Sequence, residues 1–433
     1  DAEALGRLPS PGTEIVSLDD YLARYAQYTS DEDLQALRAE APMIMMWDDH
    51  ETANDSWETG AQNHNPDDPD APEFGVSWEE RRDTALEAYY KWNPIREPES
   101  GDLRDHDKTY EFGTLADLHM LETRLQARDE TRADILTALE TRIAAYLDPA
   151  STQLAEDAAL AQVPLEVVLQ TLQFGSEEEQ QELLTGLALN SLVTESFDPT
   201  REMIGSEQLA ELVQKIGESD ATWQIIGSQT LMGRMELPVE VLAGFEDLAE
   251  LFVKSSLGII TPEEEAFLQS FDEQGEVPYN FDAWDGYQAE REVILEALAD
   301  SGSGGIVLAG DTHNAWTSNV RTADGTLAAV EFGGPGVTSP GFEGLFEPVL
   351  NPITGEPVDY VADAFLRYVD DLLFANLQDR GYMSVEITEE RVSTDYVFVS
   401  TTQSRDYETE TVTQVAELSQ FDTVQSADSF DFV

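Results

Sequence analysis

Two short segments constrain this chain more than any other feature, because each is an apolar run that ends abruptly in polar side chains. Residues 43–57 read MIMMWDDHETANDSW, and residues 305–316 read GIVLAGDTHNAW. A buried strand that ends in this way delivers its polar residues to the rim of a sheet. The two segments hold two of only five histidines in the chain. Carboxylates beside scarce imidazoles favour a metal-centred hydrolytic site, since divalent and trivalent ions take mixed oxygen and nitrogen ligands.

The rest of the chain alternates between helical and strand patterns, which predicts a layered α/β architecture. Ser17 and Ser30 are placed to cap the first two helices, and residues 60–72 have the composition of a loop. We expect helices over residues 18–28, 31–40, 78–92, 206–216 and 287–299, and extended segments over residues 43–47, 109–121, 223–228, 305–309, 326–332, 382–387 and 394–400.

Residues 129–199 have a different character, with amphipathic helical patterns rich in Leu, Ala and Glu. We interpret them as a helical insertion into one catalytic domain built from residues 1–128 and 200–405. Residues 406–433 are polar and acidic and carry weak order signals, so they are expected to form a C-terminal tail.

Acidic side chains dominate the charge of the chain, with 88 Asp and Glu against 23 Lys and Arg and a net charge of −65. A surface this negative repels phosphate backbones, so no nucleic-acid binding surface is expected. The acidic residues are spread along the whole chain, which favours a halophilic or marine source, where salt screens their mutual repulsion.

The sequence contains no apolar run near the roughly 20 residues that a membrane-spanning helix requires, which indicates a soluble protein. It also contains no cysteine, so disulfides are excluded within these residues. Cysteine content alone leaves the cellular compartment open.

The segments 47–51 (WDDHE) and 310–316 (GDTHNAW) resemble the PhoD-type alkaline phosphatases of the calcineurin-like metallophosphatase superfamily. The resemblance covers most of the chain. Further segments fall in the family's order: residues 21–37, 118–124 (LHMLETR), 203–231, 284–287 (WDGY) and 337–341 (VTSPG). It implies a β-sandwich flanked by helices.

The resemblance also implies roles for individual residues. Asp49 and Asp311 correspond to metal ligands, as does His313. His50 corresponds to the group that stabilises the phosphoryl oxygens or protonates the leaving alkoxide. Asn54 is expected to contact the phosphate or to support a ligand.

Two departures from the superfamily pattern occur at these positions. Asp49 stands where the superfamily has Asn, and Asp311 stands where it has the first His of a Gly-His-x-His motif; the PhoD-type branch shares the second departure. The extra negative charge suits a harder or more highly charged ion. One residue separates Asp311 from His313, so on an extended backbone both side chains would face the same ion.

Structural interpretations compete with each functional one. Asp48 and Asp49 have the residue type of helix N-caps, and an isolated His313 would more often be a hydrogen-bonded core residue. Arg124 is a candidate for a carboxylate or phosphate fork, but an ion pair with one of the many acidic residues is the more common arrangement.

The combined prediction is a metal-dependent phosphoesterase that uses a metal-bound hydroxide to hydrolyse phosphate monoesters or diesters at alkaline pH. Fe and Ca are the ions that the resemblance implies, with Mn or Zn as alternatives. A small-molecule phosphate ester is the expected substrate, and the periplasm or the exterior of the cell is the expected location. The rival prediction is a catalytically inactive relative that binds Ca or a protein partner through its acidic surface.

Family members place further metal ligands upstream, in segments with a Cys and a Gly-Asp-Tyr motif that this sequence does not contain. Either the numbering begins inside a longer protein, in which case we expect an N-terminal fragment of the same precursor as a partner, or the molecule has lost half of its metal site.

Overall fold

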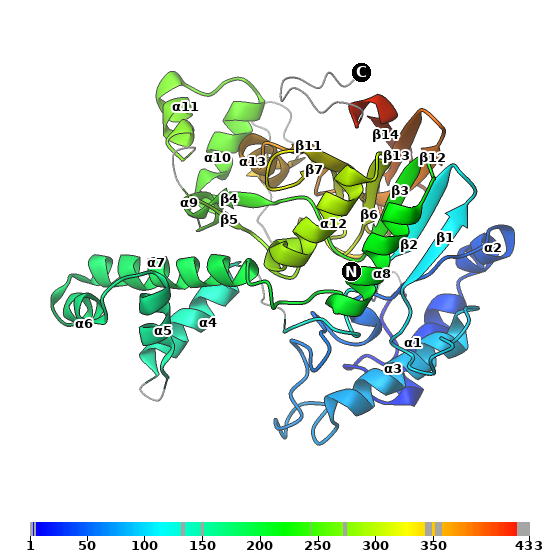
Figure 1. The fold of residues 1–433 in the computed structure, drawn as a ribbon, viewed down its shortest axis with the longest axis horizontal. Coiled ribbons are helices and arrows are strands. Elements are labelled where there is room, and N and C mark those ends of the chain that lie inside the picture. The colour runs from blue at the N-terminus through cyan, green and yellow to red at the C-terminus, as the bar shows by residue number, and fades with distance from the viewer. Residues whose placement is uncertain are drawn as a thin grey trace.

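The computed structural model describes residues 3, 6–130, 135–148, 151–243, 245–271, 275–342, 349–350 and 357–421. Its centre is a mixed seven-stranded sheet (Figure 1). In spatial order the strands are β1 (Lys108–Phe112), β2 (Ala116–Met120), β3 (Trp223–Ser228), β6 (Gly304–Ala309), β8 (Leu327–Gly333), β7 (Ala315–Arg321) and β11 (Leu372–Asn376).

Four neighbouring strands of this sheet, β2, β3, β6 and β8, are parallel. Parallel strands are usually covered on both faces, and β3 and β6 are accordingly apolar along most of their length. Successive side chains of β3 point to opposite faces: Ile226 joins one core cluster, and Trp223 and Ile225 join the other. The sheet therefore separates two hydrophobic cores.

A three-stranded antiparallel sheet packs on the face that carries Trp223 and Ile225. Its strands are β12 (Arg380–Ile387), β13 (Arg391–Val399) and β14 (Thr409–Glu417). Tyr396 and Phe398 of the middle strand enter this core. The two sheets form the expected sandwich.

Helices cover the other face of the large sheet (Figure 1). α8 (Gly205–Glu218) and α12 (Gln288–Asp300) place Leu212, Ile294 and Leu298 against the sheet's Val307. Further helices and two short strand pairs extend this core. The helices are α9 (Val239–Ala243), α10 (Phe245–Ser256), α11 (Pro262–Gln269) and α13 (Tyr360–Tyr368). β4 (Glu236–Pro238) pairs with β5 (Glu276–Pro278), and β9 (Val349–Leu350) pairs with β10 (Pro357–Val358).

The N-terminal residues form α1 (Leu18–Thr29) and α2 (Glu32–Glu40), and α3 (Trp78–Trp92) packs against α1. Ser17 caps α1 in a capping box with Asp20. Asp31, not Ser30, caps α2, because its carboxylate accepts hydrogen bonds from the backbone N–H groups of Asp33 and Leu34.

Four helices form an arm that projects from the body of the molecule (Figure 1). They are α4 (Ile135–Leu147), α5 (Gln153–Leu160), α6 (Leu165–Phe174) and α7 (Glu177–Ser196). The two chain segments that lead into the arm lie side by side, since the Asp129 N–H donates to the Glu202 carbonyl at 2.9 Å and the Glu202 N–H donates to the Asp129 carboxylate at 2.9 Å.

A buried ionic network holds the arm together. Asp157 of α5 is 2% exposed. Its carboxylate accepts hydrogen bonds from Arg142 and Tyr146 of α4 and from Ser191 of α7, at 2.5 to 3.1 Å. One carboxylate thus joins three helices.

The layered α/β architecture is confirmed. The expected extended segments 305–309 and 326–332 correspond to the neighbouring strands β6 and β8, and the segments 382–387 and 394–400 correspond to the paired strands β12 and β13. Two expectations are wrong. The strand expected over residues 43–47 is absent, since these residues pair with no described strand, and residues 409–417 of the expected tail form β14. Residues 131–134 and 149–150 of the expected helical insertion and residues 422–433 of the expected tail lie outside the described residues.

The division into a catalytic domain (1–128 and 200–405), a helical insertion (129–199) and a tail (406–433) remains our proposal. Among the described residues, no helix is both long and apolar enough to cross a membrane.

The ionic network gives the first prediction. Arg142→Met should destabilise the arm by about 3 to 5 kcal/mol, because it leaves the buried Asp157 carboxylate without its cation. In Arg142→Met, hydrogen exchange should be faster than in the parent over residues 135–196, and this increase should exceed any increase in β3 and β6. Arg405→Met, at a side chain that is 89% exposed, is the control. Equal exchange in the two variants would show that the network does not stabilise the arm.

Candidate active site

The site lies at the carboxyl edge of the parallel strands. β2, β3 and β6 run in the same direction and end at Met120, Ser228 and Ala309. The residues that follow them therefore meet at one rim, as they do in open α/β sheets. Arg124 follows β2, and Asp311 follows β6.

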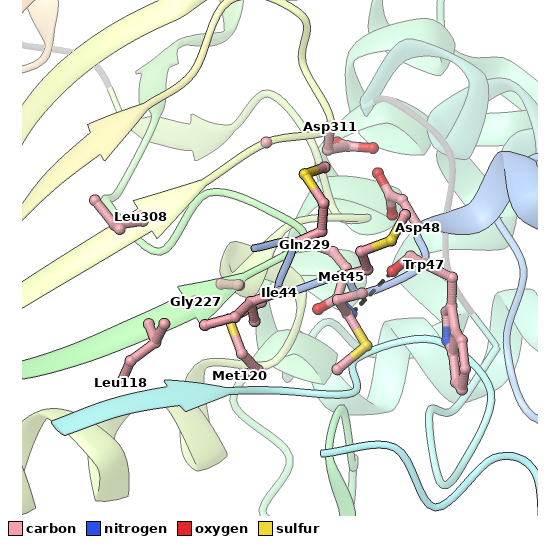
Figure 2. A pocket seen from close by; sticks show the side chains of 14 residues that line it. Ile44, Met45, Trp47, Asp48, Leu118, Met120, Gly227, Gln229, Leu308 and Asp311 are labelled. Atoms are coloured by element: carbon pink, nitrogen blue, oxygen red, sulfur yellow. Dashed lines mark hydrogen bonds between the residues drawn. The ribbon is translucent and has the colours of Figure 1, made fainter. Parts of the chain in front are cut away.

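Residues 43–46, which precede Trp47, Asp48 and Asp49, lie at this rim without pairing to a described strand. Their apolar side chains, from Met43 to Met46, line a cavity of about 570 Å³ together with Leu118, Met120 and Leu308 of the sheet (Figure 2). The carboxylates of Asp48 and Asp311 lie at one end of this cavity. Residues 43–47 were expected to form a strand, but a strand needs a neighbouring strand to satisfy its backbone hydrogen bonds, and none of the described strands pairs with them. Their anchors are side chains: the Trp47 carbonyl accepts from the Gln229 amide at 3.1 Å.

Three carboxylates converge at the rim. Oxygen atoms of Asp48, Asp49 and Asp311 all lie within 4.8 Å of one another. Asp49 is 4% exposed, and its two oxygens accept hydrogen bonds from the backbone N–H groups of His50 and Asp55, both at 2.8 Å. Among the described residues this is the group whose ligand atoms could hold a metal ion.

Arg124 joins the carboxylates to one another. Its side chain is fully buried, and it donates to Asp48 Oδ1 at 2.7 Å, to both oxygens of Asp282 at 2.7 and 3.0 Å and to Asp311 Oδ1 at 3.0 Å. Arg128 donates to the same Asp282 carboxylate at 2.7 Å. Asp282 is therefore held by two guanidinium groups, whereas Asp48 and Asp311 each bind Arg124 through one oxygen only.

Negative charge exceeds positive charge at the rim. Burial, reinforced by the Asp48 carboxylate, raises the pKa of Asp311 well above its ordinary value although Arg124 opposes the shift. Burial also raises the pKa of Asp48 against the opposing charge of Arg124. Burial and the Asp282 carboxylate raise the pKa of Asp55 to about 7. A bound cation would relieve this excess charge, so the donor set fits a metal ion with a preference for oxygen ligands.

The backbone at the rim adopts an uncommon conformation. Asp55, Asp311 and His313 have φ values of 46°, 65° and 60°. Such left-handed conformations are rare outside glycine and concentrate at functional sites. The exit from β6 is therefore not extended, and the expected extended backbone at Asp311 and His313 is wrong. That both side chains bind one ion stays a prediction.

The structure places the other candidate residues around this group. The His50 side chain is 70% exposed, with Nε2 3.8 Å from Asp49 Oδ2. Asn54 donates its side-chain amide to Gln62. His313 Nδ1 lies 2.7 Å from the Pro340 carbonyl oxygen. His313 is outside the carboxylate group, and Asp48 takes part instead.

The interpretation of Asp48 and Asp49 as helix N-caps is partly correct. Asp48 precedes the short 3-10 helix η1 (Asp49–Glu51), and its N–H donates to the Glu51 carboxylate at 2.8 Å. Its own carboxylate, however, binds Arg124.

Sequence reasoning missed Asp282 and Arg128 altogether. Asp282 stands two positions before Trp284, the first residue of the WDGY segment, but no spacing connects it with Arg124. Arg128 stands four residues after Arg124, which was the one available signal for a second cation in this loop.

Comparisons with known proteins give a consistent result. The model of the PhoD-like phosphatase family matches residues 1–396. Alkaline phosphatase D of Bacillus subtilis (strain 168) is 24% identical over 394 residues, which cover 88% of this chain and 48% of that protein. A solved structure described as "Structure of PhoD" has a TM-score of 0.57 and 21% identity, and the match covers 95% of this chain and 59% of that chain. The chain spans about half the length of the curated relative.

The excess of carboxylates gives the second prediction. In metal-free protein, Asp311→Asn should raise the unfolding midpoint at pH 8, since it removes a buried charge. When the pKa of an acid is higher in the folded state than in the unfolded state, the protein loses stability as the pH rises between the two pKa values. The unfolded-state pKa of Asp311 is 3.8. The advantage of the variant should therefore shrink towards pH 4.

Saturation with Ca²⁺ should reverse the order of the two midpoints, because the variant lacks one of the three carboxylates that could hold the ion. The exposed Asp370→Asn is the control. If Asp311→Asn lowers the midpoint of the metal-free protein at pH 8, the claim of uncompensated charge is wrong.

Proposed function

Because the chain belongs to the PhoD-like phosphatase family, we propose that it is a metal-dependent phosphoesterase that hydrolyses small-molecule phosphate monoesters or diesters at alkaline pH. The observation that carries the proposal is the convergence of Asp48, Asp49 and Asp311 within 4.8 Å at the carboxyl edge of the sheet. Hard carboxylate oxygens at a strand edge are a common basis for metal-assisted hydrolysis.

Asp49 and Asp311 are the proposed metal ligands, with Asp48 from the same group and His313 from the adjacent turn. We favour Ca and Fe(III), since carboxylates are hard ligands, and Mn or Zn are the alternatives. A cation held there would supply positive charge to the phosphoryl oxygens and would acidify a water molecule.

The protein's own side chains would divide the remaining work. Arg124 would keep the carboxylates together, since it donates to three of them. His50, exposed beside Asp49, would face the phosphate and donate a proton to the leaving oxygen. Asn54 would contact the phosphate after its amide turns away from Gln62.

The number of ligands supports a further polypeptide segment as a partner. Three carboxylates and one histidine are few for two ions, because Ca²⁺ takes six to eight oxygen ligands. We propose that an N-terminal fragment of the same precursor supplies the others. Adding that fragment should raise the number of bound ions per chain, and an unchanged number would reject the partnership.

Turnover gives the third prediction. The metal-free chain, combined with the N-terminal fragment and reloaded separately with Ca²⁺, Fe(III), Mn²⁺ or Zn²⁺, should hydrolyse p-nitrophenyl phosphate or its bis ester only when loaded. The chain without that fragment should lack turnover. His50→Gln should lower kcat by about 10²- to 10⁴-fold, the usual contribution of a proton-transfer group. The control is His64→Gln, in the loop of residues 60–72. Stoichiometric Ca²⁺ binding without turnover would instead support the catalytically inactive relative.

Location and solvent form a separate part of the proposal. We propose a periplasmic or secreted protein adapted to high salt, as a net charge of −65 is best tolerated where ions screen it. Cell fractionation tests the location, and recovery in the cytoplasm would reject it.

The salt dependence is the fourth prediction. The unfolding midpoint should rise as KCl increases from 0.1 M to above 2 M, because the Debye length falls from about 10 Å to less than 3 Å. Scanning calorimetry at fixed pH measures it, with sucrose of equal osmolality as the control for general solvent effects. A midpoint that is flat or falls over this range would contradict adaptation to salt.

A further inference from the structure

Glu122 is a fully buried carboxylate at the centre of the loop that carries Arg124. Its side chain is 0% exposed. Oε1 accepts from the backbone N–H groups of Arg124 and Leu125 at 2.9 and 2.8 Å, and Oε2 accepts from the N–H of Gln126 at 2.7 Å. Three successive N–H groups wrapped around one anion form a rigid turn.

The same carboxylate also binds the segment that carries the metal-site acids. The indole Nε1–H of Trp47 donates to Glu122 Oε1 at 2.8 Å, and Trp47 is fully buried. Trp47 directly precedes Asp48 and Asp49. Glu122 therefore fixes the Arg124 loop and the Asp48–Asp49 turn relative to each other.

Helix α8 holds Glu122 from the opposite side. The Glu122 N–H donates to the Gln208 side-chain oxygen, and the Gln208 amide donates to the Glu122 carbonyl, both at 3.0 Å. Glu122 is thus bound through its backbone to the helical layer and through its side chain to the rim.

The placement of Arg124 decides which carboxylate oxygens remain for a cation. Arg124 binds Oδ1 of Asp48 and Oδ1 of Asp311, and it binds both oxygens of Asp282. One oxygen each of Asp48 and Asp311 is left outside this clamp. A small rotation of the guanidinium would pair it with different oxygens, so its position matters for the ligand set.

We propose that Glu122 is a positioning residue that, by fixing Arg124 against the Trp47–Asp49 segment, directs one oxygen each of Asp48 and Asp311 towards a bound cation. This inference rests on the proposed metal site. Groups that orient metal ligands from outside the coordination sphere typically change metal affinity by 10- to 100-fold.

Calorimetric titration of the metal-free chain with Ca²⁺ and with Mn²⁺ tests the proposal. Glu122→Gln should weaken binding by about 10-fold or more, since its amide would face the Gln126 N–H with a donor. The matched control is Glu331→Gln. Glu331 is also 0% exposed and also accepts from successive backbone N–H groups, those of Met232 and Gly233. Its other hydrogen-bond donor is the Ser318 hydroxyl and not Arg124. Both variants should lose stability, and only Glu122→Gln should lose affinity.

A double-mutant cycle shows whether Glu122 acts through Arg124. In an Arg124→Lys background, adding Glu122→Gln should weaken binding by less than about 3-fold, because the group it positions has already changed. An undiminished penalty in that background would overturn the proposed route. If Glu122→Gln does not fold, Trp47→Phe keeps an aromatic ring at this buried position but removes the indole donor, and it should weaken binding several-fold.

The possible outcomes separate this inference from the enzymatic proposal. Equal affinity in the parent and Glu122→Gln, or equal loss in Glu122→Gln and Glu331→Gln, overturns the role of Glu122 and leaves the function standing. If Glu122→Gln weakens binding but the parent, supplied with the N-terminal fragment, hydrolyses neither ester, the role of Glu122 is supported and the function is rejected. A parent chain that binds neither cation overturns both.

Discussion

The buried guanidinium of Arg124 is the group on which the arrangement of the rim depends. It binds the carboxylates of Asp48, Asp282 and Asp311, which are 76, 158 and 187 residues away in sequence. Without a cation between them, these acids would repel one another in a region from which water is largely excluded. A single side chain from the end of β2 thus allows three distant segments to meet, and it leaves enough negative charge for a further cation.

The strands that support this group are tightly packed, whereas the backbone at the rim is strained. β3 and β6 are apolar and buried between two cores, so the ends of these strands are fixed. The left-handed backbone at Asp311 and His313 lies immediately beyond the end of β6. Packing of the sheet can hold such a conformation because the strand next to it has no freedom to relax. Stability is concentrated in the sheet, and the strained geometry is confined to the residues that would perform chemistry.

The parts of the fold that local patterns determine were predictable from sequence. Residues 223–228 form β3 as expected, and helix 78–92 has the expected bounds, because periodicity and capping act over a few residues. Residues 43–47 show the limit: their composition favours a strand, but pairing depends on a neighbour that no local pattern reveals. The site followed the same division. Asp49 and Asp311 stood out beside histidines, whereas Asp282 enters only through a contact across 158 residues, and the positive φ at Asp311 has no signature in a non-glycine residue.

The paired segments at the base of the helical arm affect how the sequence of the arm can change during evolution. Asp129 and Glu202 are hydrogen-bonded to each other, so the chain leaves the body and returns to it at the same point. Closing a loop between adjacent ends costs little more when the loop grows. The arm can therefore be lengthened, trimmed or exchanged by mutation without moving β2 or β3, and its sequence is free to diverge at a rate that the rim residues cannot share.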